Sequence, residues 1–458
     1  MWLKKIFTPL ALPIHFFAAA IFLGAGLLCQ PISCSGEPVS FLNALFTATS
    51  AACVTGLAVV DTGTAYSRFG HTVILALIQL GGLGIMTFST LIFYLWRRRV
   101  SLADHIAVGQ SLLHDASFHL GRFLVRMAAV TAFIEAVGAI SLYAFDPVGF
   151  APFSAVFHSV SAFCNAGFGL RPDNLVAYAE NPGVNLVIMW LIVSGGLGFA
   201  VLIEGYRAAK DRLLRLAGAA SGRRPLALSW QARTVFAVSA FLVFAGAAMI
   251  ACGEFLGGRY GELSLLDKTM AALFQSVTCR TAGFNTIDIG RMADASLVIM
   301  ILLMFIGGSP GSCAGGVKTT TFQVLAAFGR AKMFGRKQAV VGRYAVDDDT
   351  VDRAVTLTIF ALGLVLVSVL LMCFTEGAVA PHVEAGGRFL EILFEVVSAF
   401  GTVGLTTGIT PSLTPAGKLV IIMLMFVGRL GPILFLSVLQ GFEEPRRYRW
   451  PEQGMMIG

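Results

Sequence analysis

The sequence predicts an all-α polytopic membrane protein in which four helix–pore loop–helix repeats lie in parallel around one central pore. The first observation is composition: of 458 residues, 56% are hydrophobic and only 13% are charged, about half the charged fraction of a soluble domain. The second is a short segment that occurs four times, each copy followed by a long apolar run. The third is that most of the 33 lysine and arginine residues lie between apolar runs, where they orient a chain in a membrane rather than bind nucleic acid.

The recurring segment ends in a small-residue turn at a glycine. Its copies are FTATSAACVTGL at 46–57, FHSVSAFCNAGF at 157–168, FQSVTCRTAGF at 274–284 and FEVVSAFGTVGL at 394–405. The equivalent glycines are Gly56, Gly167, Gly283 and Gly404. Each segment is too short to cross a bilayer, and non-helical backbone at membrane depth is tolerated only where protein buries it or where it lines a water-filled cavity. The pattern is typical of re-entrant loops around a pore, with close packing of helices as the alternative for any single copy.

Each loop is expected to hold a short pore helix before its phenylalanine and an extended filter segment up to its glycine. The predicted filter residues are Val54, Thr55, Gly56, Asn165, Ala166, Gly167, Thr281, Ala282, Gly283, Thr402, Val403 and Gly404. Their side chains differ widely between units, so we expect ions to be read by main-chain carbonyls, which can replace a hydration shell. Glycine allows this because it adopts positive φ without steric cost. No carboxylate ring is present, which disfavours calcium and favours a dehydrated monovalent cation.

The chain divides into repeats at 1–100, 101–215, 216–345 and 346–458. The first runs from about 8 to 96, with its outer helix starting near Pro13 and its inner helix at 72–95. The later repeats are expected at 123–145, 152–171 and 184–206; at 232–256, 265–285 and 295–328; and at 351–375, 388–405 and 417–440. The apolar N-terminal run is interpreted as a retained first helix, because an equivalent run precedes every later loop.

Lysine and arginine concentrate at the N-terminus and after each inner helix. By the positive-inside rule, both termini are cytoplasmic and the loops enter from outside. All four units then share one orientation, which favours a pore along the membrane normal over an inverted-repeat carrier.

The inner helices share a glycine-rich mark: GGLG at 81–84 and 195–198, GGSPG at 307–311 and GRLGP at 428–432. Close helix packing accounts for most of it. In the third copy the helix should stop, because glycines and a proline crowd together. The predicted gating loop comprises Gly307, Gly308, Ser309, Pro310, Gly311, Ser312, Gly315, Gly316 and Lys318. Unwound backbone just below the filter can obstruct ions, and a passive kink is the alternative.

Arg429 lies in the fourth inner helix, and an ionisable residue inside a membrane span is a functional hypothesis by default. As a pore-lining charge it would repel cations and limit occupancy or rate. The alternative is a structural partner for loop carbonyls or for a carboxylate such as Glu395. Arg280, in the third loop, is expected to brace the filter from behind.

Four motifs carry a family resemblance: TSAACVTGLAVVDTGT at 49–64, IQLGGLGIMTF at 78–88, QSVTCRTAGFNTIDI at 275–289 and GGSPGSCAGGVKTTTF at 307–322. With them the chain resembles the Trk/Ktr/HKT superfamily of potassium transporters, and within it the KtrB-type membrane subunit of bacterial Ktr potassium uptake systems. The resemblance covers nearly the whole chain.

The resemblance implies K⁺ uptake through a four-loop selectivity filter in a bacterial plasma membrane, a gating loop at about 307–318 and a homodimer. It also implies a cytosolic ring of RCK-type, KtrA-like regulatory subunits that bind ATP, ADP or NAD. The chain has no strand-linked GxGxxG or Walker motif, so we expect it to bind no cofactor itself. The only metal expected is the transported K⁺, with Na⁺ as a possible activator. Glycine at all four filter positions favours K⁺, because a serine in the first loop is associated with Na⁺ passage in plant relatives.

Two alternatives concern the transported ion and the mechanism. One is a Na⁺-permeable or K⁺/Na⁺ co-transporting relative of the same fold, and the other is a secondary transporter of another fold with a midplane site. An intramembrane enzyme with Ser309 or Ser312 as nucleophile lacks an activating histidine or aspartate in a nearby helix. We therefore expect no enzymatic activity.

Overall fold

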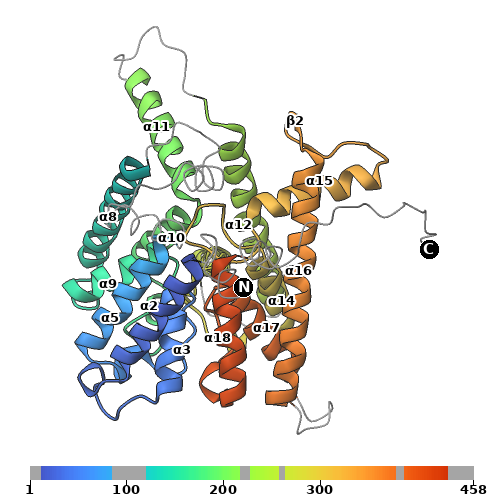
Figure 1. Cartoon of the computed structure of the whole chain (residues 1–458). Helices are drawn as coiled ribbons and strands as arrows, with labels where there is room; N and C mark the ends of the chain where they lie inside the picture. Colours follow the sequence, from blue (N-terminus) through green and yellow to red (C-terminus); the bar gives the residue numbers. More distant parts are fainter. Residues whose placement is uncertain (1–11, 85–119, 217–226, 257–263, 378–385, 432–458) are drawn as a thin grey trace.

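The computed structural model describes residues 12–84, 120–216, 227–256, 264–377 and 386–431, and these are mostly helical (Figure 1). Unit 1 holds α2 (Leu12–Leu28), α3 (Phe41–Ala52), α4 (Thr62–Ala65) and α5 (Arg68–Gly82). Unit 2 holds α8 (Leu120–Phe145), α9 (Pro152–Phe163), α10 (Pro182–Gly196) and α11 (Phe199–Leu216). Unit 3 holds α12 (Trp230–Leu256), α13 (Leu265–Thr278), α14 (Asp294–Phe305) and α15 (Thr319–Met333). Unit 4 holds α16 (Asp348–Met372), α17 (Arg388–Gly401) and α18 (Pro415–Leu430).

Short elements join these helices. They are the 3₁₀ turns Pro31–Ser33, Val176–Tyr178, Ile289–Arg291 and Thr410–Ser412, the π turn Cys373–Gly377, and an antiparallel hairpin of β1 (Val340–Val341) and β2 (Tyr344–Ala345). The hairpin is a small departure from the predicted all-α fold, and its turn contains Gly342 at φ 65°.

Three helices in the described part of the chain are long and apolar enough to cross a membrane: Val125–Phe145, Trp230–Glu254 and Asp348–Glu376. They are the first helices of units 2, 3 and 4. Their outward faces carry exposed apolar side chains, including Phe133, Ile140, Phe241, Phe244, Ile359 and Leu366. An apolar surface of this extent, repeated on three long helices, indicates contact with lipid rather than water.

The four short helices α3, α9, α13 and α17, here called the loop helices, lie where the pore helices were predicted but begin earlier than the phenylalanine and continue past it. Phe46, Phe157, Phe274 and Phe394 each lie inside their helix and are fully buried. The prediction that the helix precedes the phenylalanine was therefore wrong. The phenylalanine anchors the helix in the protein core, and the helix ends at the small residues that follow.

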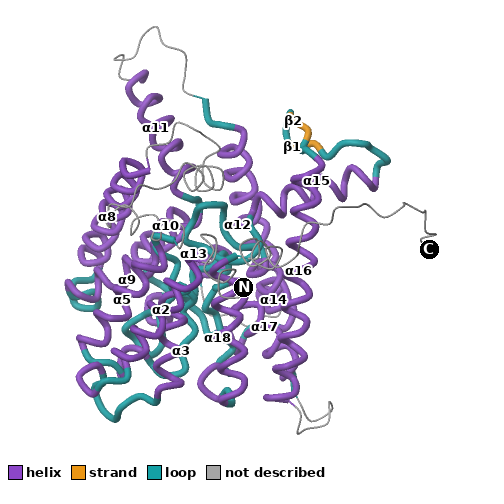
Figure 2. The backbone as a smooth tube through the Cα atoms, viewed as in Figure 1, coloured by secondary structure: helices purple, strands orange, loops and turns teal. Residues whose placement is uncertain are grey.

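The helix that follows the loop helix in each unit, here called the closing helix (α5, α10, α14 and α18), packs against the loop helix of the next unit. Contacts join α5 to α9, α10 to α13, α14 to α17, and finally α18 back to α3 of the first unit. The four units therefore follow one another in a closed cycle. Figure 2 shows loop backbone running through the interior of this helical assembly.

The predicted helix at 184–206 was wrong, because the chain turns by 112° between α10 and α11. Gly198, the last residue of GGLG, adopts φ 88°, a left-handed conformation that ends a right-handed helix at no steric cost to glycine. The equivalent Gly84 of unit 1 adopts φ 86° directly after α5 ends. The predicted continuations to 95 and, in unit 4, to 440 lie outside the described residues.

The close packing predicted for the glycine-rich marks is present in three units. A methyl group at Gly81, Gly195 or Gly428 would overlap a carbonyl oxygen at the end of a loop helix, on Ala52, Phe163 or Phe400 respectively. These glycines let the closing helix approach the backbone of its own unit's loop helix.

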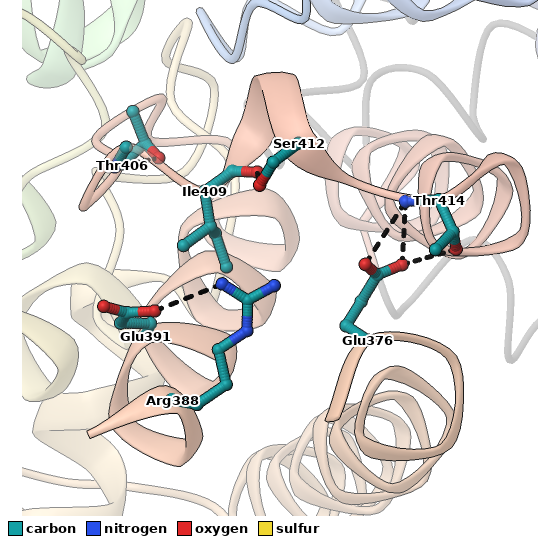
Figure 3. Close-up of polar contacts among 8 residues, drawn as sticks. Glu376, Arg388, Glu391, Thr406, Ile409, Ser412 and Thr414 are labelled. Atoms are coloured by element: carbon teal, nitrogen blue, oxygen red, sulfur yellow. Dashed lines mark hydrogen bonds and ion pairs between the residues drawn. The ribbon is translucent and has the colours of Figure 1, made fainter. Parts of the chain in front are cut away.

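A carboxylate at the end of the first helix holds the start of the closing helix in units 3 and 4. The Glu376 carboxylate accepts from the Thr414 backbone amide at 3.0 and 3.2 Å and from its hydroxyl (Figure 3), at the N-cap of α18. Glu254 likewise accepts from the Ala293 amide at 2.9 Å, at the N-cap of α14. Negative charge at a helix N-terminus is stabilising, so these contacts fix where the closing helices begin.

Candidate functional site

The four predicted filter segments share one backbone conformation. Two residues before each glycine the chain enters the left-handed region, with φ of 55° at Val54, 62° at Asn165, 76° at Thr281 and 51° at Thr402. The glycines themselves adopt φ of 97°, 68°, 77° and 89° in chain order. Left-handed backbone at non-glycine residues is strained, so its recurrence at four equivalent positions indicates a shared structural requirement.

A hydrogen bond from the residue before each glycine back to the loop helix closes every turn. Thr55 donates to the carbonyl of Ser50 at 2.8 Å, Ala166 to Ser161 at 2.7 Å, and Val403 to Ser398 at 2.8 Å. In unit 3 Ala282 donates to Thr278 at 2.9 Å, and this turn contains one residue fewer. The deletion seen in the third sequence copy therefore falls in the turn, and the filter segment keeps its conformation.

The side chains of the same four residues, Ser50, Ser161, Thr278 and Ser398, also contact the filter segments. The Ser50 and Ser398 hydroxyls accept from the amides of Gly56 and Gly404 at 3.0 and 3.1 Å. The Ser161 and Thr278 hydroxyls donate to the carbonyls of Phe168 and Phe284 at 2.8 and 2.6 Å. Sequence reasoning missed these residues, although a hydroxyl recurs at the same place in every copy.

The four glycines, here called the glycine ring, meet in a closed cycle. A methyl group on Gly56 would lie 2.5 Å from the carbonyl oxygen of Ala166, one on Gly167 would lie 2.8 Å from that of Ala282, and one on Gly283 would lie 2.6 Å from that of Val403. On Gly404 it would overlap the carbonyl oxygen of Thr55, which returns to the first unit. The structure thus brings together segments separated by more than a hundred residues, with main-chain carbonyls between neighbouring glycines.

Three hydroxyls in these segments, on Thr55, Thr281 and Thr402, are buried and find no hydrogen-bond partner within the described part of the chain. Buried polar atoms without partners are uncommon in native proteins and call for an explanation such as an ion or water. The Asn165 amide instead faces the carbonyls of Ile192 and Ala162 at 3.1 and 3.0 Å. Arg280 extends toward α12, where it donates to the Ser239 carbonyl at 3.4 Å.

The helix break predicted in unit 3 is confirmed, since α14 ends at Phe305 and α15 begins at Thr319. The intervening segment folds into a loop whose neck is closed by Gly307 donating to Val317 at 2.9 Å and Val317 donating to Phe305 at 3.2 Å. The Lys318 ammonium donates to the Ala314 carbonyl at 2.6 Å within the loop.

This loop is held against the broken helix of unit 2. Ser309 and Cys313 donate their amides to Gly196 and Gly195 at 3.0 and 3.2 Å, and Phe199 donates to Gly311 at 3.2 Å. The carbonyls at the end of α10, which have no partner inside their own helix, are therefore satisfied by the loop.

The loop also lies directly against the filter turns. A methyl group on Gly315 would meet the Thr402 hydroxyl and lie 2.9 Å from the Gly401 carbonyl, and one on Gly307 would lie 3.4 Å from the Thr281 methyl. The loop therefore contacts the Thr402 hydroxyl and the Thr281 methyl group, and a side chain larger than glycine does not fit at Gly315.

Arg429 connects this loop to unit 1. Its guanidinium donates to the carbonyls of Cys313, in the loop, and Gly81, near the end of α5. Of the partners considered from the sequence, the structure thus brings loop carbonyls and not Glu395 to Arg429. Glu395 instead accepts from the Thr410 hydroxyl.

Comparison with known proteins matches residues 16–440 to the TrkH family model, described as cation transport protein. The chain belongs to the TrkH cation transport family. Its family resemblance, predicted from the four motifs, is thereby confirmed. The family consists of ion transporters, in agreement with the expectation of no enzymatic activity.

Two relatives align with this TrkH-family chain over nearly its full length. The Ktr system potassium uptake protein B of Bacillus subtilis is 38% identical over 100% of the chain and 98% of its own length. The potassium/sodium uptake protein NtpJ of Enterococcus hirae is 35% identical over 99% of the chain and 98% of its own length. The crystal structure of the potassium transporter TrkH from Vibrio parahaemolyticus shares the fold, with a TM-score of 0.71 over 94% of this chain and 84% of that one at 18% identity.

Proposed function

We propose that this chain carries K⁺ across the membrane along the axis of the glycine ring. The observation that carries the proposal is the closed cycle of four glycines with a main-chain carbonyl between each neighbouring pair. Carbonyl dipoles around one axis can replace the hydration shell of a monovalent cation. The unpartnered hydroxyls of Thr55, Thr281 and Thr402 supply further oxygen atoms, and relatives of similar length are named for potassium uptake.

The 307–318 loop acts as the gate in this proposal. It lies against the turns of units 3 and 4, in contact with Thr281, Gly401 and Thr402. Hydrogen bonds to α10 and from Arg429 hold it closed, so opening requires these contacts to be exchanged for others or for water. In this proposal Arg429 stabilises the closed gate by its hydrogen bonds, and it is not a free charge in the ion path.

The wider assembly follows from the family. We propose that the chain works as the translocating subunit of a Ktr-like system, as a homodimer, with both termini on the cytoplasmic side. Regulatory subunits of RCK type that bind ATP, ADP or NAD would act on the gate from there. Support comes from the relatives named as part of Ktr systems and from the lysine and arginine distribution.

A second candidate is passage of both K⁺ and Na⁺, with Na⁺ as activator or co-transported ion. One relative of nearly full coverage is named for potassium and sodium uptake, which supports this alternative. Glycine at all four positions of the ring favours K⁺. The two candidates differ in the ratio of K⁺ flux to Na⁺ flux.

Growth of a potassium-uptake-deficient bacterium on limiting K⁺, together with rubidium uptake, tests the proposal. The chain is expressed alone or with a regulatory subunit. We expect rescue by the wild type and no rescue by Gly56→Asp, whose side chain cannot fit beside the Ala166 carbonyl. Full rescue by Gly56→Asp would exclude the first loop from the ion path.

Selectivity is measured in vesicles that contain purified chain. Replacing Gly56 by Ser should lower the K⁺ to Na⁺ flux ratio, because an added side chain shifts the neighbouring carbonyl. Addition of Na⁺ to the wild type separates the roles of that ion: activation raises K⁺ flux without Na⁺ entry, whereas co-transport moves both ions in a fixed ratio.

A further inference from the structure

A basic surface lies between α15 and α16, in residues 330–345, here called the α15–α16 tip. Its five cationic side chains are Arg330, Lys332, Arg336, Lys337 and Arg343, and the tip contains no aspartate or glutamate. None of the five belongs to an ion pair among the described residues. The next acidic residues along the chain are Asp347, Asp348 and Asp349 at the start of α16, where negative charge stabilises the helix N-terminus. The tip is therefore a cluster of positive charge without an internal counterion.

Large apolar side chains protrude from the same tip. Met333 is 84% exposed, Phe334 70% and Tyr344 59%. The tip is nonetheless folded, because Ala339, Val341 and Val346 pack with Ala327 and Val351 of the flanking helices into a small core of their own. The exposed apolar residues thus lie on the outside of an ordered element, and they are not its core.

The tip lies at the depth where two membrane spans end. Trp230, the first residue of the α12 span, donates its indole N–H to the Val341 carbonyl at 3.1 Å, and its ring lies 5.4 Å from that of Tyr344. The α16 span begins at Asp348, three residues after β2 ends. Tryptophan and tyrosine gather at the level of lipid headgroups. In Figure 1, α15 crosses the end of α16 and projects beyond it, away from the rest of the molecule.

We propose that the α15–α16 tip binds the headgroups of anionic phospholipids, with Met333 and Phe334 inserted at the outer edge of the hydrocarbon layer. The five cations then face phosphate groups beside them, and the apolar side chains leave water. This combination of basic and apolar residues at one surface is how interfacial segments bind membranes. An acidic soluble protein would neutralise the charge, but the position of the tip beside two span ends places the apolar residues at lipid level.

The proposal requires only that the chain lies in a membrane, and it stands whether or not the glycine ring conducts K⁺. Lipid binding by the tip would anchor the end of α15 that lies farthest from the 307–318 loop. Because α15 begins directly after that loop, anionic lipid at one end of the helix can bias the position of its other end.

Native mass spectrometry of the purified full-length chain tests the proposal, with a phosphatidylglycerol and a phosphatidylcholine of the same acyl chains as probes. We expect Arg336→Gln/Lys337→Gln to weaken phosphatidylglycerol binding about fivefold per removed charge and to leave phosphatidylcholine binding unchanged. The control Arg207→Gln/Lys210→Gln removes two exposed charges from α11 and should leave both affinities unchanged. Met333→Ser/Phe334→Ser should weaken binding of both lipids. Size-exclusion profiles establish that each variant is folded.

Two results would overturn the proposal. Equal loss of phosphatidylglycerol binding by the tip and α11 variants would show that net charge alone attracts the lipid. Efficient crosslinking between two copies of a Phe334→Cys variant in anionic vesicles, with lipid affinity unchanged by the tip substitutions, would assign the surface to a second copy of this chain.

Discussion

Replacing Gly404 by alanine tests the glycine ring most directly, because the chain offers a matched control four residues later. Gly404 and Gly408 both have left-handed backbone, with φ of 89° and 105°. Alanine in that region costs roughly 1–2 kcal/mol at either position. A methyl group on Gly404 would also overlap the Thr55 carbonyl oxygen, whereas one on Gly408 meets nothing within 4 Å. The difference between the two variants therefore isolates the contact within the ring.

We expect the overlap to add about 1–3 kcal/mol, the usual cost of overpacking, since backbone cannot rotate away as a side chain can. At 1.4 kcal/mol per factor of ten, rubidium uptake by Gly404→Ala should fall about fivefold to a hundredfold below that of Gly408→Ala. Uptake is measured in vesicles with equal amounts of folded protein, and thermal unfolding in detergent reports the backbone term of each variant. Equal uptake by the two variants would refute the reasoning that Gly404 and Thr55 meet on the ion path.

Three further predictions concern the 307–318 loop, a helix start and pH. Arg429→Met removes the donors to the loop and to α5 and should raise rubidium uptake in the absence of a regulatory subunit. The control Lys418→Met, at the other end of α18, should leave uptake unchanged. Unchanged uptake in both variants would mean that the 307–318 loop is only a kink. Glu376→Gln weakens the charged cap on α18 and should lower the free energy of unfolding by about 1.5–3 kcal/mol. The control Glu391→Gln breaks the 3.4 Å ion pair with an arginine shown in Figure 3 and should lower it by about 0.2–1 kcal/mol. Equal losses of unfolding free energy in denaturant titrations would contradict the capping role of Glu376. The pKa of Asp146 is held below its ordinary value, mainly by a hydrogen bond from a backbone amide three residues on and then by one from a tyrosine hydroxyl. The ionised carboxylate therefore stabilises the fold above the unfolded pKa of about 3.9. This stabilisation is lost as pH falls through the folded pKa. Thermal midpoints should therefore drop on acidification below about pH 4 in the wild type and drop less in Asp146→Asn, and parallel curves would count against this assignment.

The loop helices show which features of the fold local sequence could predict. Four copies of a segment with a glycine at near-constant spacing predicted four similar turns, and the structure has them at Val54, Asn165, Thr281 and Thr402. The helix ends were misplaced because burial of the phenylalanine, a tertiary contact, decides that the helix continues past it. The break after Phe305 was predictable since glycine and proline destabilise a helix locally.

The two GGLG marks show where local sequence is ambiguous. At 195–198 the motif turns the chain by 112°, yet the same four letters were expected to lie within a continuous helix. The turn is decided by the 307–318 loop, whose Ser309 and Cys313 take the carbonyls at the end of α10. Those contacts join residues more than a hundred positions apart, which no local pattern records.

By itself, the sequence determined the membrane environment, the fourfold repeat, the conformation of the four turns that end in glycine and the interruption of the third closing helix. Each of these follows from composition, spacing and the conformational freedom of glycine, which act within a few residues. The tertiary structure alone decided which carbonyl lies beside each glycine of the ring, and that Arg429 donates to Cys313 and Gly81 rather than to Glu395. The reason is that a guanidinium or a carbonyl takes whichever partner the packed helices bring within reach, and that choice is made between segments far apart in the chain.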